Sequence, residues 1–314
     1  MNGHKQVILI TGGLGNLGAW MTDHFANKED YDVYVLAKSD RNILVDHPFK
    51  KIFCDITDLE QLRASLAGIS PEYIIHLASF NETFSDNYAL KALLINSLGT
   101  RNLLECSEGW SVKKFIYFST FHVYGKSVGL ITELNTPGPL NDYAITHLFA
   151  EEYVRMFAEK CKLPYIILRL SNSYGCPKDR NSSKWYLLFN DLCRQAVVNR
   201  AIHLKTNGLA VRDFISMKDV CTAVERVMLH QSISNEIFNL GSGMSYSLIQ
   251  IAEYVKEAFY EEYGEVILVS KNEQDKNKYP VSLNFDVNKL RKHISFNPGI
   301  FFKDEAKKIF RITV

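Results

Sequence analysis

The feature that most constrains the fold is an apolar run that ends in a cluster of glycines. Residues 7–11 are continuously apolar, and residues 19–27 show helical periodicity. Between them lie Gly12, Gly13, Gly15 and Gly18, with Asn16 and Leu17 inside the cluster. This order predicts a buried strand that turns sharply into a helix. Backbone N–H groups at such a helix N-terminus hold a pyrophosphate, and glycine lets the backbone approach it closely.

Strand-like and helical segments alternate through about residue 170. Strands are expected at residues 7–11, 33–37, 51–54, 73–77, 115–119 and 165–170, and helices at residues 19–27, 58–66, 87–107 and 143–160. Alternation of this kind builds βαβ units. It therefore predicts an α/β fold with a Rossmann-type doubly wound parallel sheet, covered by helices on both faces.

The pattern changes beyond about residue 175. Helices are expected at residues 181–200, 218–230 and 247–263, strands at 211–215 and 236–240, and a short helix near residue 314. This mixture predicts a smaller C-terminal lobe. We assign a dinucleotide-binding domain to residues 1–175 and a substrate-binding lobe to residues 176–314. No linker separates them, so we expect the two to be interleaved.

Composition excludes several classes of protein. A net charge of +1 over 314 residues gives no electrostatic footprint for nucleic acid or an anionic membrane. No apolar stretch approaches the roughly 20 residues of a membrane span, and no secretory signal is recognised. The six cysteines are scattered without a C-x-x-C pair, so neither a metal site nor a disulfide framework is predicted. We expect a cytoplasmic protein.

The end of the second predicted strand bears on the choice of cofactor. An acid usually stands there when the ligand is NAD, but this chain has Ala37. Lys38, Ser39 and Arg41 suit a 2′-phosphate, whereas Asp40 would repel one. A charged surface turn is the alternative interpretation. NAD(H) and NADP(H) both stay open, with a slight preference for NADP(H).

Several short motifs follow in a fixed order. They are Cys54-Asp55-Ile56-Thr57-Asp58, His76-Leu77-Ala78-Ser79, Asn96 to Leu104, Ser119 to Gly125, Arg169 to Gly175, Arg212-Asp213-Phe214-Ile215 and Asn239 to Gly243. Together they resemble the extended short-chain dehydrogenases, in the NAD(P)-dependent sugar-nucleotide epimerase/dehydratase branch. The resemblance implies that the glycine cluster and Lys38 bind the cofactor together with several later residues. These are Asp55, Ile56, Leu77, Ala78, Ser79, Asn96, Tyr143 and His147.

The resemblance implies that Tyr143 is the catalytic tyrosine, which moves the proton of a sugar hydroxyl while a nicotinamide takes or gives a hydride. In the family a lysine four residues on, on the same helix face, bonds the nicotinamide ribose and favours the phenolate. This chain has His147 there. An imidazole with an ordinary pKa of about 6.5 is mostly neutral at pH 7. We expect His147 to keep the hydrogen bond and lose much of the charge; the alternative is a helix residue without a role and feeble or absent catalysis.

The residues after the strand at 115–119 imply the type of reaction. By resemblance, Thr120 bonds the reacting sugar oxygen, and Ser119 is the second candidate. Dehydratases of the family carry an Asp-Glu pair next, but this chain has Phe121 and His122. Paired carboxylates are missing, so 4,6-dehydration is not expected. His122 is either a substitute acid/base or a loop histidine near the cofactor.

Two further residues imply substrate contacts. Arg212 resembles the guanidinium that grips the nucleotide diphosphate, because its planar fork suits phosphate oxygens; the alternative is an ion pair with Asp213. Asn172 resembles a residue that bonds a phosphate or sugar oxygen. Residues 181–185 begin the region that selects sugar and base in the family.

We therefore expect an NAD(P)-dependent oxidoreductase that acts on a nucleotide-activated sugar at carbon 4, as a dehydrogenase or 4-keto reductase. Enzymes of capsule or lipopolysaccharide synthesis, including GDP-heptose oxidoreductases, are candidates by resemblance. A carbon-4 epimerase is the alternative, and a catalytically silent NAD(P)-binding sensor or scaffold is another. The resemblance also implies a homodimer built from the helices at 87–107 and 143–160.

Overall fold

The computed structural model describes residues 5–82, 85–179, 184–279 and 282–313. It forms two compact units, and the chain passes between them several times. The first unit comprises Met1–Lys126, Glu133–Leu170 and Cys221–Asn239, and the second comprises Ser127–Thr132, Ser171–Val220 and Leu240–Val314. The sequence predicts a boundary near residue 175 with interleaved parts, and the contacts place residues 221–239, from beyond that boundary, in the first unit.

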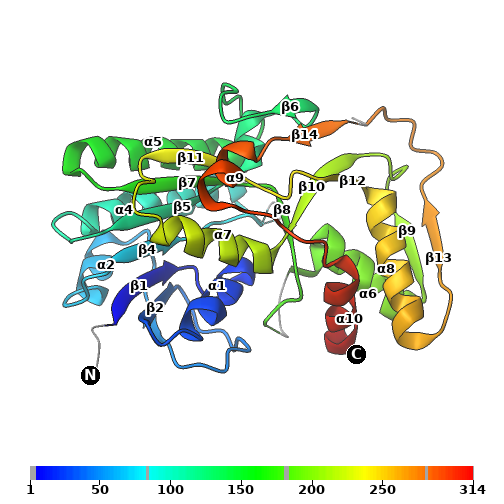
Figure 1. The fold of residues 1–314 in the computed structure, drawn as a ribbon, viewed down its shortest axis with the longest axis horizontal. Coiled ribbons are helices and arrows are strands. Elements are labelled where there is room, and N and C mark those ends of the chain that lie inside the picture. The colour runs from blue at the N-terminus through cyan, green and yellow to red at the C-terminus, as the bar shows by residue number, and fades with distance from the viewer. Residues whose placement is uncertain (1–4, 83–84, 180–183, 280–281, 314) are drawn as a thin grey trace. The chain divides into compact units, whose positions relative to one another are not determined.

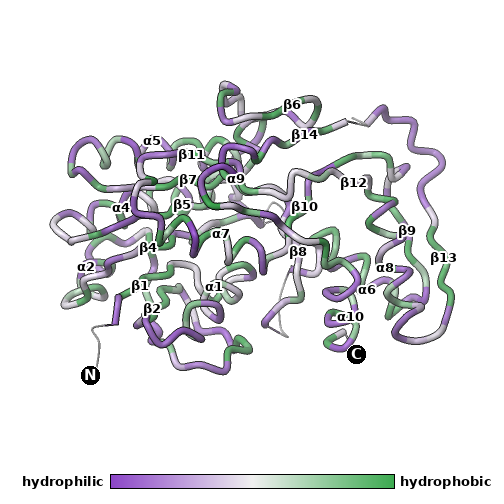
Figure 2. The backbone as a smooth tube through the Cα atoms, viewed as in Figure 1, coloured by the Kyte–Doolittle hydropathy of each residue, from purple (hydrophilic) through white to green (hydrophobic). Residues whose placement is uncertain are grey.

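The first unit is built on a seven-stranded sheet in the order β11-β7-β5-β4-β1-β2-β3 (Figure 1). Its strands are β1 (Gln6–Thr11), β2 (Tyr31–Ala37), β3 (Lys50–Phe53), β4 (Tyr73–His76), β5 (Lys114–Thr120), β7 (Tyr165–Leu170) and β11 (Glu236–Leu240). The neighbouring pairs from β7 to β3 are all parallel. Figure 2 shows the hydrophobic residues of β1 and β7, in keeping with strands buried on both faces.

Helices cover both faces of this sheet. They are α1 (Asn16–Ala26), α2 (Leu59–Ser65), α3 (Tyr88–Ala92), α4 (Gly99–Cys106), α5 (Asp142–Cys161) and most of α7 (Met217–Leu229). Helices α2, α4 and α5 share one core with the sheet through Leu62, Leu103 and Val154. Helices α1 and α7 lie together (Figure 1), joined by Glu225, which accepts from Lys28 and bonds His24, both at 2.8 Å. The expected doubly wound Rossmann-type fold is confirmed.

One expected strand lies elsewhere than predicted. Residues 236–240 were assigned to the smaller lobe, but as β11 they form the edge of the seven-stranded sheet beside β7. Backbone hydrogen bonds from Asn235 N–H to the Tyr165 carbonyl at 2.7 Å and from Ser171 N–H to the Leu240 carbonyl at 2.9 Å hold it there. The position arises from long-range pairing, which the local pattern of residues does not encode.

The helix expected at residues 87–107 is regular only at its ends. A π-helical segment, η1 (Leu93–Leu98), separates α3 from α4. The segment buries Asn96 and Ser97. Single π turns inside α-helices occur frequently at functional sites, and this one presents Asn96 to the loop after β4.

The second unit contains short strands and longer helices. Its elements are β6 (Gly129–Ile131), β8 (Asn172–Tyr174), η3 (Lys184–Tyr186), α6 (Leu188–Asn199), β9 (Ala201–Leu204), β10 (Val211–Ser216), β12 (Ser245–Ser247), α8 (Leu248–Tyr263), β13 (Leu268–Lys271), β14 (Leu283–Phe285), α9 (Asn288–Ile294) and α10 (Phe302–Thr313). Three small sheets pair β12-β10-β8, β13-β9 and β14-β6. The helix expected at 181–200 begins only at Leu188, and residues 180–183 lie outside the described residues.

An aromatic cluster forms the core of the second unit. Phe302 stacks on Tyr174 with ring centroids 4.3 Å apart and on Tyr254 at 5.2 Å. Helices α6, α8 and α10 contribute most of the apolar residues around it. Among the described residues of the whole chain, no helix has the length and apolar character needed to cross a lipid bilayer.

A buried ion pair fixes α5 to the sheet of the first unit. Arg169 on β7 donates to both carboxylate oxygens of Glu151 on α5, from Nε at 3.0 Å and from a terminal nitrogen at 2.7 Å. The two side chains are only 4% and 1% exposed. Ser119 donates to the same carboxylate at 2.5 Å, and the Arg169 guanidinium lies 4.8 Å from the ring centroid of Tyr124. Every charge in this network is matched.

Breaking this pair should destabilise the protein strongly. We expect Glu151→Ala to lower the free energy of unfolding by about 3–5 kcal/mol, because it leaves the buried Arg169 cation without a counter-ion. The matched control is Glu152→Ala, which removes an exposed ion pair with Arg155 and should cost under about 1 kcal/mol. Chemical denaturation measures both, and equal losses would contradict the assignment.

Candidate active site

The glycine turn after β1 has no room for side chains at its two tightest points. Gly12 has φ +68°, and a Cβ there would lie 2.8 Å from the backbone nitrogen of Ala78. A Cβ on Gly18 would lie 2.1 Å from the carbonyl oxygen of Gly12. Helix α1 follows directly, with Gly15 as an N-cap that offers no side-chain hydrogen bond. Its first N–H groups are therefore free of a side-chain cap and suited to an anion.

Asn16 points to a missing partner in the same place. Its Oδ1 is buried and has no hydrogen-bond partner among the residues that the structure describes. Buried polar atoms are nearly always satisfied, so an acceptor left in this state marks a place where a ligand or water donates. The turn that excludes a Cβ and the uncapped start of α1, with Leu17 partly buried, fit the pyrophosphate portion of a dinucleotide, whereas the Asn16 oxygen needs a donor such as a ribose hydroxyl or a water.

The charged residues after β2 are partly neutralised. Lys38 forms an ion pair with Asp55 at 2.6 Å, and Asp40 forms one with Lys51 at 2.7 Å. Although burial acts to raise it, hydrogen bonds from Lys38 and Thr57 hold the pKa of Asp55 below its usual value. Of the three residues expected to suit a 2′-phosphate, Lys38 is thus committed to a carboxylate.

Arg41 follows β2 and Ile56 follows β3, and the two side chains differ in their contacts with the rest of the protein. The Arg41 guanidinium forms no hydrogen bond or ion pair with any described residue. Ile56 is buried, and its Cγ2 would lie 2.7 Å from a Cβ on Gly99. Asn102 on α4 donates to the Ile56 carbonyl at 3.1 Å, so this loop is anchored to α4.

A buried histidine connects β4 with the glycine turn. His76 is fully buried, its Nδ1 lies 2.6 Å from the Thr11 hydroxyl, and its Nε2 lies 2.8 Å from the Thr100 hydroxyl. The Thr11 oxygen also accepts from the Ala78 N–H at 3.3 Å. The Leu77 N–H donates to the Thr11 carbonyl at 3.1 Å. The residues expected against the cofactor, 77–79, are therefore tied to the end of β1.

Asn96 is fully used within the protein. Its Oδ1 accepts from the Phe80 N–H at 2.6 Å, and its Nδ2 donates to the Phe80 carbonyl at 3.2 Å and to the Thr146 hydroxyl at 3.1 Å. The side chain is buried. Asn96 thus positions the loop after β4 against α5, and its expected contact with a cofactor stays a prediction.

The first turns of α5 bring the expected catalytic pair together. Asn141 caps the helix by accepting from the Ala144 N–H at 2.8 Å, which fixes the start of α5. The rings of Tyr143 and His147 meet edge to face with centroids 4.5 Å apart. The Nε2 of His147 lies 3.2 Å from the hydroxyl of Ser79, which is exposed.

His147 is buried to a degree that the sequence did not indicate. Only 2% of its surface is exposed, and its Nδ1 lies 2.7 Å from the hydroxyl of Tyr117 on β5. Burial and the neighbouring His122 lower the pKa of His147 to about 3. The expectation that His147 carries little charge is therefore strengthened: at neutral pH the imidazole carries none.

Ser119 and Thr120 have different surroundings at the end of β5. Ser119 gives its proton to the buried Glu151, so its hydroxyl serves the ion-pair network. Thr120 caps the short helix η2 (Phe121–Tyr124), accepting from the His122 N–H at 3.2 Å. Successive strand residues point to opposite faces, and Thr120 is therefore the better candidate for a sugar hydroxyl.

The two residues in place of the Asp-Glu pair are aromatic neighbours. Phe121 is buried and His122 is exposed, with ring centroids 4.3 Å apart. The His122 ring also lies 6.2 Å from the ring of Tyr143. His122 therefore lies at the candidate site, whichever of its two expected roles it has.

In the second unit, the residues expected to bind substrate lie on paired strands. Asn172 on β8 donates to the Asp213 carbonyl of β10 at 2.9 Å. The Asp213 carboxylate is buried and accepts from the Ser171 hydroxyl at 2.5 Å and from the Ser242 N–H at 3.0 Å. Arg212 is exposed and forms no hydrogen bond or ion pair with a described residue. The alternative of an Arg212–Asp213 ion pair is wrong, because serines already satisfy Asp213.

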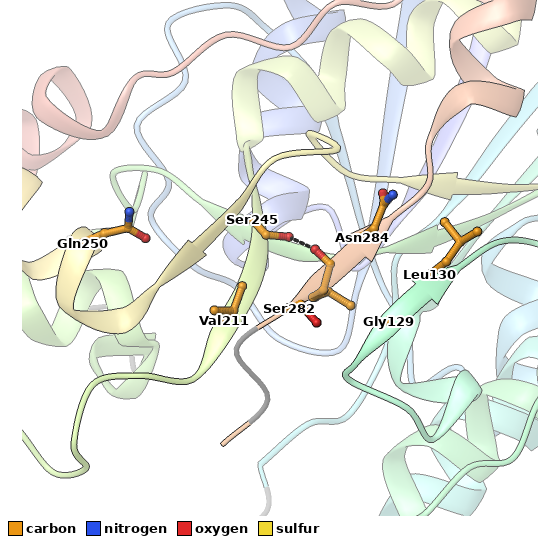
Figure 3. A pocket seen from close by; sticks show the side chains of 8 residues that line it. Gly129, Leu130, Val211, Ser245, Gln250, Ser282 and Asn284 are labelled. Carbon is orange, nitrogen blue, oxygen red and sulfur yellow. Dashed lines mark hydrogen bonds between the residues drawn. The ribbon is translucent and has the colours of Figure 1, made fainter. Parts of the chain in front are cut away.

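A shallow pocket of about 450 Å³ also lies in the second unit (Figure 3). Polar side chains of Ser245, Gln250, Ser282 and Asn284 surround it, together with Val211. Val211 and Arg212 are consecutive on β10, so their side chains point to opposite faces of the strand. This pocket is therefore separate from the surface that Arg212 presents.

Sequence reasoning missed two residues that shape the site. Tyr117 contacts His147, and Glu151 binds Ser119. The available signal was spacing: Tyr143, His147 and Glu151 repeat every four residues on one helix face, while Tyr117 and Ser119 share one strand face. Among the described residues, no group of side chains is arranged to hold a metal ion.

Comparison with known proteins places this geometry in a family. The family model described as "NAD dependent epimerase/dehydratase family" matches residues 8–241. A UDP-glucose 4-epimerase of Mycoplasma genitalium is 25% identical over 98% of this chain and 91% of its own length. A GDP-6-deoxy-D-talose 4-dehydrogenase of Aggregatibacter actinomycetemcomitans is 28% identical over 80% of this chain and 79% of its own.

Two further similarities extend this result. A dTDP-D-glucose 4,6-dehydratase of Dictyostelium discoideum is 30% identical over 80% of this chain, which spans 61% of that enzyme's length. The crystal structure of a UDP-glucuronic acid 4-epimerase from Bacillus cereus, in complex with UDP-glucuronic acid and NAD, superposes with a TM-score of 0.80 at 21% identity, covering 98% of this chain and 99% of that one. These similarities favour the alternative of a carbon-4 epimerase over the main expectation of a dehydrogenase or reductase. The chain belongs to the NAD-dependent epimerase/dehydratase family of sugar-nucleotide enzymes.

Proposed function

We propose that the protein is a carbon-4 epimerase of a nucleotide-activated sugar. The observation that carries this proposal is the Tyr143–His147 pair, with ring centroids 4.5 Å apart and His147 bonded to the exposed Ser79, which follows the residue that lies against Gly12. The similarity to a UDP-glucose 4-epimerase over nearly the full length of both chains supports it. So does the absence of an Asp-Glu pair at Phe121 and His122, which removes the acid and base that a dehydratase needs.

In this proposal each residue has a distinct task. A bound nicotinamide would supply reversible hydride exchange with carbon 4. Tyr143 takes the proton of the carbon-4 hydroxyl and later returns a proton to the same oxygen. Thr120 offers a hydrogen bond to that oxygen. The roles proposed for Asn172 and Arg212 of the second unit are contacts with the nucleotide, Arg212 through phosphate oxygens, since its guanidinium is not committed to a described residue.

A 4-dehydrogenase or 4-keto reductase is the second candidate. The similarity to an enzyme that acts on a GDP-linked 6-deoxy sugar favours it. The two candidates differ in one respect that can be measured: the epimerase inverts carbon 4 without net change in the cofactor, whereas the oxidoreductase converts one cofactor for each sugar.

For the cofactor, we propose NAD(H). The slight preference for NADP(H) depended on Lys38, Ser39 and Arg41, but Lys38 already pairs with Asp55. The carboxylate of Asp55 would also repel a 2′-phosphate brought beside Lys38. Ser39 and Arg41 stay available for that phosphate, and a single cation is a weak basis for selecting it.

The central test is an assay of the purified protein with nucleotide sugars. Incubation with UDP-, GDP- and dTDP-hexoses should give products inverted at carbon 4 by NMR, and mass spectrometry of the dinucleotide released on denaturation should identify NAD. Tyr143→Phe should lower kcat about 10²–10⁴-fold, because proton transfer is lost. Tyr153→Phe, on the same helix, is the control and should leave kcat unchanged. Stoichiometric NADH formation would instead establish the oxidoreductase, and binding without turnover would establish the silent protein.

Arg212 should act on binding more than on chemistry. We expect Arg212→Ala to raise the KM for the nucleotide sugar roughly 10–100-fold with a smaller change in kcat, since a charge-assisted hydrogen bond contributes about 1.5–3 kcal/mol. Arg311→Ala, which removes an exposed pair with Glu262, is the control. A large fall in kcat with unchanged KM would contradict a role in holding the diphosphate.

The homodimer remains a proposal that exposed apolar residues support. Leu90, Leu93 and Leu94 on α3 and η1 are exposed, as are Phe149 and Met156 on α5. The segments are neighbours, since Ser97 of η1 donates to the Thr146 carbonyl of α5 at 2.9 Å. Exposed apolar patches of this kind mark interaction sites.

Charges on this surface should separate the dimer. We expect Phe149→Glu with Met156→Glu to halve the mass measured by sedimentation at micromolar concentration, because each glutamate would be buried without a partner. Tyr260→Glu on α8, also exposed and aromatic, should leave the mass unchanged. A native protein that sediments as a monomer would refute the proposal.

A further inference from the structure

Tyr117 and His147 form a hydrogen-bonded pair that the proposed reaction does not explain. Tyr117 comes from β5 and His147 from α5, and both side chains are at least 98% buried, with exposures of 1% and 2%. Their polar atoms lie 2.7 Å apart. In this hydrogen bond one group donates and the other accepts, and the choice decides what His147 presents on its other side.

Donor and acceptor chemistry settles that choice. The Tyr117 hydroxyl has one proton and two hydrogen-bonding neighbours, His147 Nδ1 at 2.7 Å and the hydroxyl of Thr100. Burial raises the pKa of Tyr117 well above its ordinary value, so the phenol keeps its proton. An imidazole nitrogen is more basic than an alcohol oxygen or a phenolic oxygen, so Nδ1 is a better acceptor for this proton than the Thr100 hydroxyl, and Tyr117 is a poorer acceptor than His147. Tyr117 therefore donates to Nδ1, and in the neutral ring the proton lies on Nε2.

The proton on Nε2 points to the exposed side of the pair. His147 Nε2 lies 3.2 Å from the Ser79 hydroxyl, and Ser79 is exposed on the loop after β4. The imidazole thus offers one hydrogen-bond donor at Ser79 and no positive charge, where a lysine would offer both.

His76 provides an internal comparison for the same reasoning. Thr100 donates its proton to the Asn96 carbonyl at 2.5 Å, so it can only accept from His76 Nε2 at 2.8 Å. His76 is therefore also protonated on Nε2, and its Nδ1 accepts from Thr11. The rings of His76 and Tyr117 lie 5.6 Å apart. Burial and the nearby His147 lower the pKa of His76 to about 3, so two neutral imidazoles flank Tyr117.

The groups that face His147 are consistent with a neutral ring. His76 on β4, Tyr117 on β5, His122 on η2 and Tyr143 one turn away surround it. The one carboxylate nearby, Glu151, already binds Arg169 and Ser119. No described carboxylate is therefore available to hold a proton on a second nitrogen of His147.

We propose that Tyr117 is a positioning residue that holds His147 in the neutral form protonated at Nε2, so that the imidazole provides at Ser79 the hydrogen-bond donor of the family's lysine without its charge. The inference rests on the proposed function for its benefit to catalysis. Its structural content, the tautomer and its cause, concerns residues of this chain alone.

The direct test is nitrogen NMR of the ¹⁵N-histidine-labelled protein without added ligand. We expect His147 and His76 to show a protonated Nε2 and an unprotonated Nδ1, unchanged across about pH 5 to 8, the range in which an ordinary histidine titrates. A protonated Nδ1 on His147, or titration with a midpoint near the ordinary value of about 6.5, would overturn the proposal. This result does not depend on which sugar the protein accepts, so it stands apart from the test of function.

Variants then link the tautomer to the site. Tyr117→Phe removes the donor, and we expect a mixture of tautomers at His147 with His76 unchanged, together with a roughly tenfold loss of dinucleotide affinity. Tyr165→Phe, on the neighbouring strand β7, is the matched control and should alter neither. If Tyr117→Phe kept His147 protonated on Nε2 alone, Tyr117 would not be its cause. If that variant fails to fold, the spectrum of the unaltered protein still decides the tautomer.

Discussion

The position of α5 depends on the need to satisfy polar groups that it buries against the sheet. Glu151 is almost inaccessible to solvent and is compensated by Arg169 and Ser119, and His147 is compensated by Tyr117. A buried charge or donor without its partner costs several kcal/mol, more than most single apolar contacts contribute. These contacts therefore allow little sliding or rotation of the helix. Tyr143 stands in the first turn of the same helix, so the position of its ring follows from bonds made one and two turns further on.

The sequence predicted those parts of the fold whose cause is local. The glycine cluster predicted the first strand, turn and helix, because a tight turn that leaves no room for Cβ atoms requires glycines close together in the sequence. The spacing of Tyr143 and His147 predicted that both lie on one helix face, because that too depends only on nearby residues. What it did not predict is pairing over long distances. Lys38 met Asp55, residues 236–240 joined the larger sheet as β11, and Tyr117 met His147, because each partner is remote in sequence and chosen by the fold.

The short strands of the second unit illustrate the same limit. β6 and β14 pair although more than a hundred residues separate them, and each has only three residues. A segment of that length has no periodicity to read. The opposite error is to take closeness in sequence for contact. The adjacent positions of Arg212 and Asp213 suggested an ion pair as an alternative. Strand geometry places the two side chains on opposite faces, and buried serines satisfy the carboxylate in place of the arginine.

A neutral His147 has a consequence for the direction of the chemistry. A cation beside the catalytic tyrosine favours the phenolate, which is the state that accepts a proton when an alcohol is oxidised. In the proposed reaction, a neutral His147 therefore removes one electrostatic support for the step in which Tyr143 takes a proton from the alcohol. For the proposed enzyme this loss concerns the oxidation half of the cycle, and the reduction half, in which Tyr143 returns a proton, does not need the charge. An epimerase must do both in each cycle, and a fast second half limits escape of its keto intermediate. A neutral His147 is thus compatible with the proposed epimerase, in which the alcohol is restored before the sugar leaves.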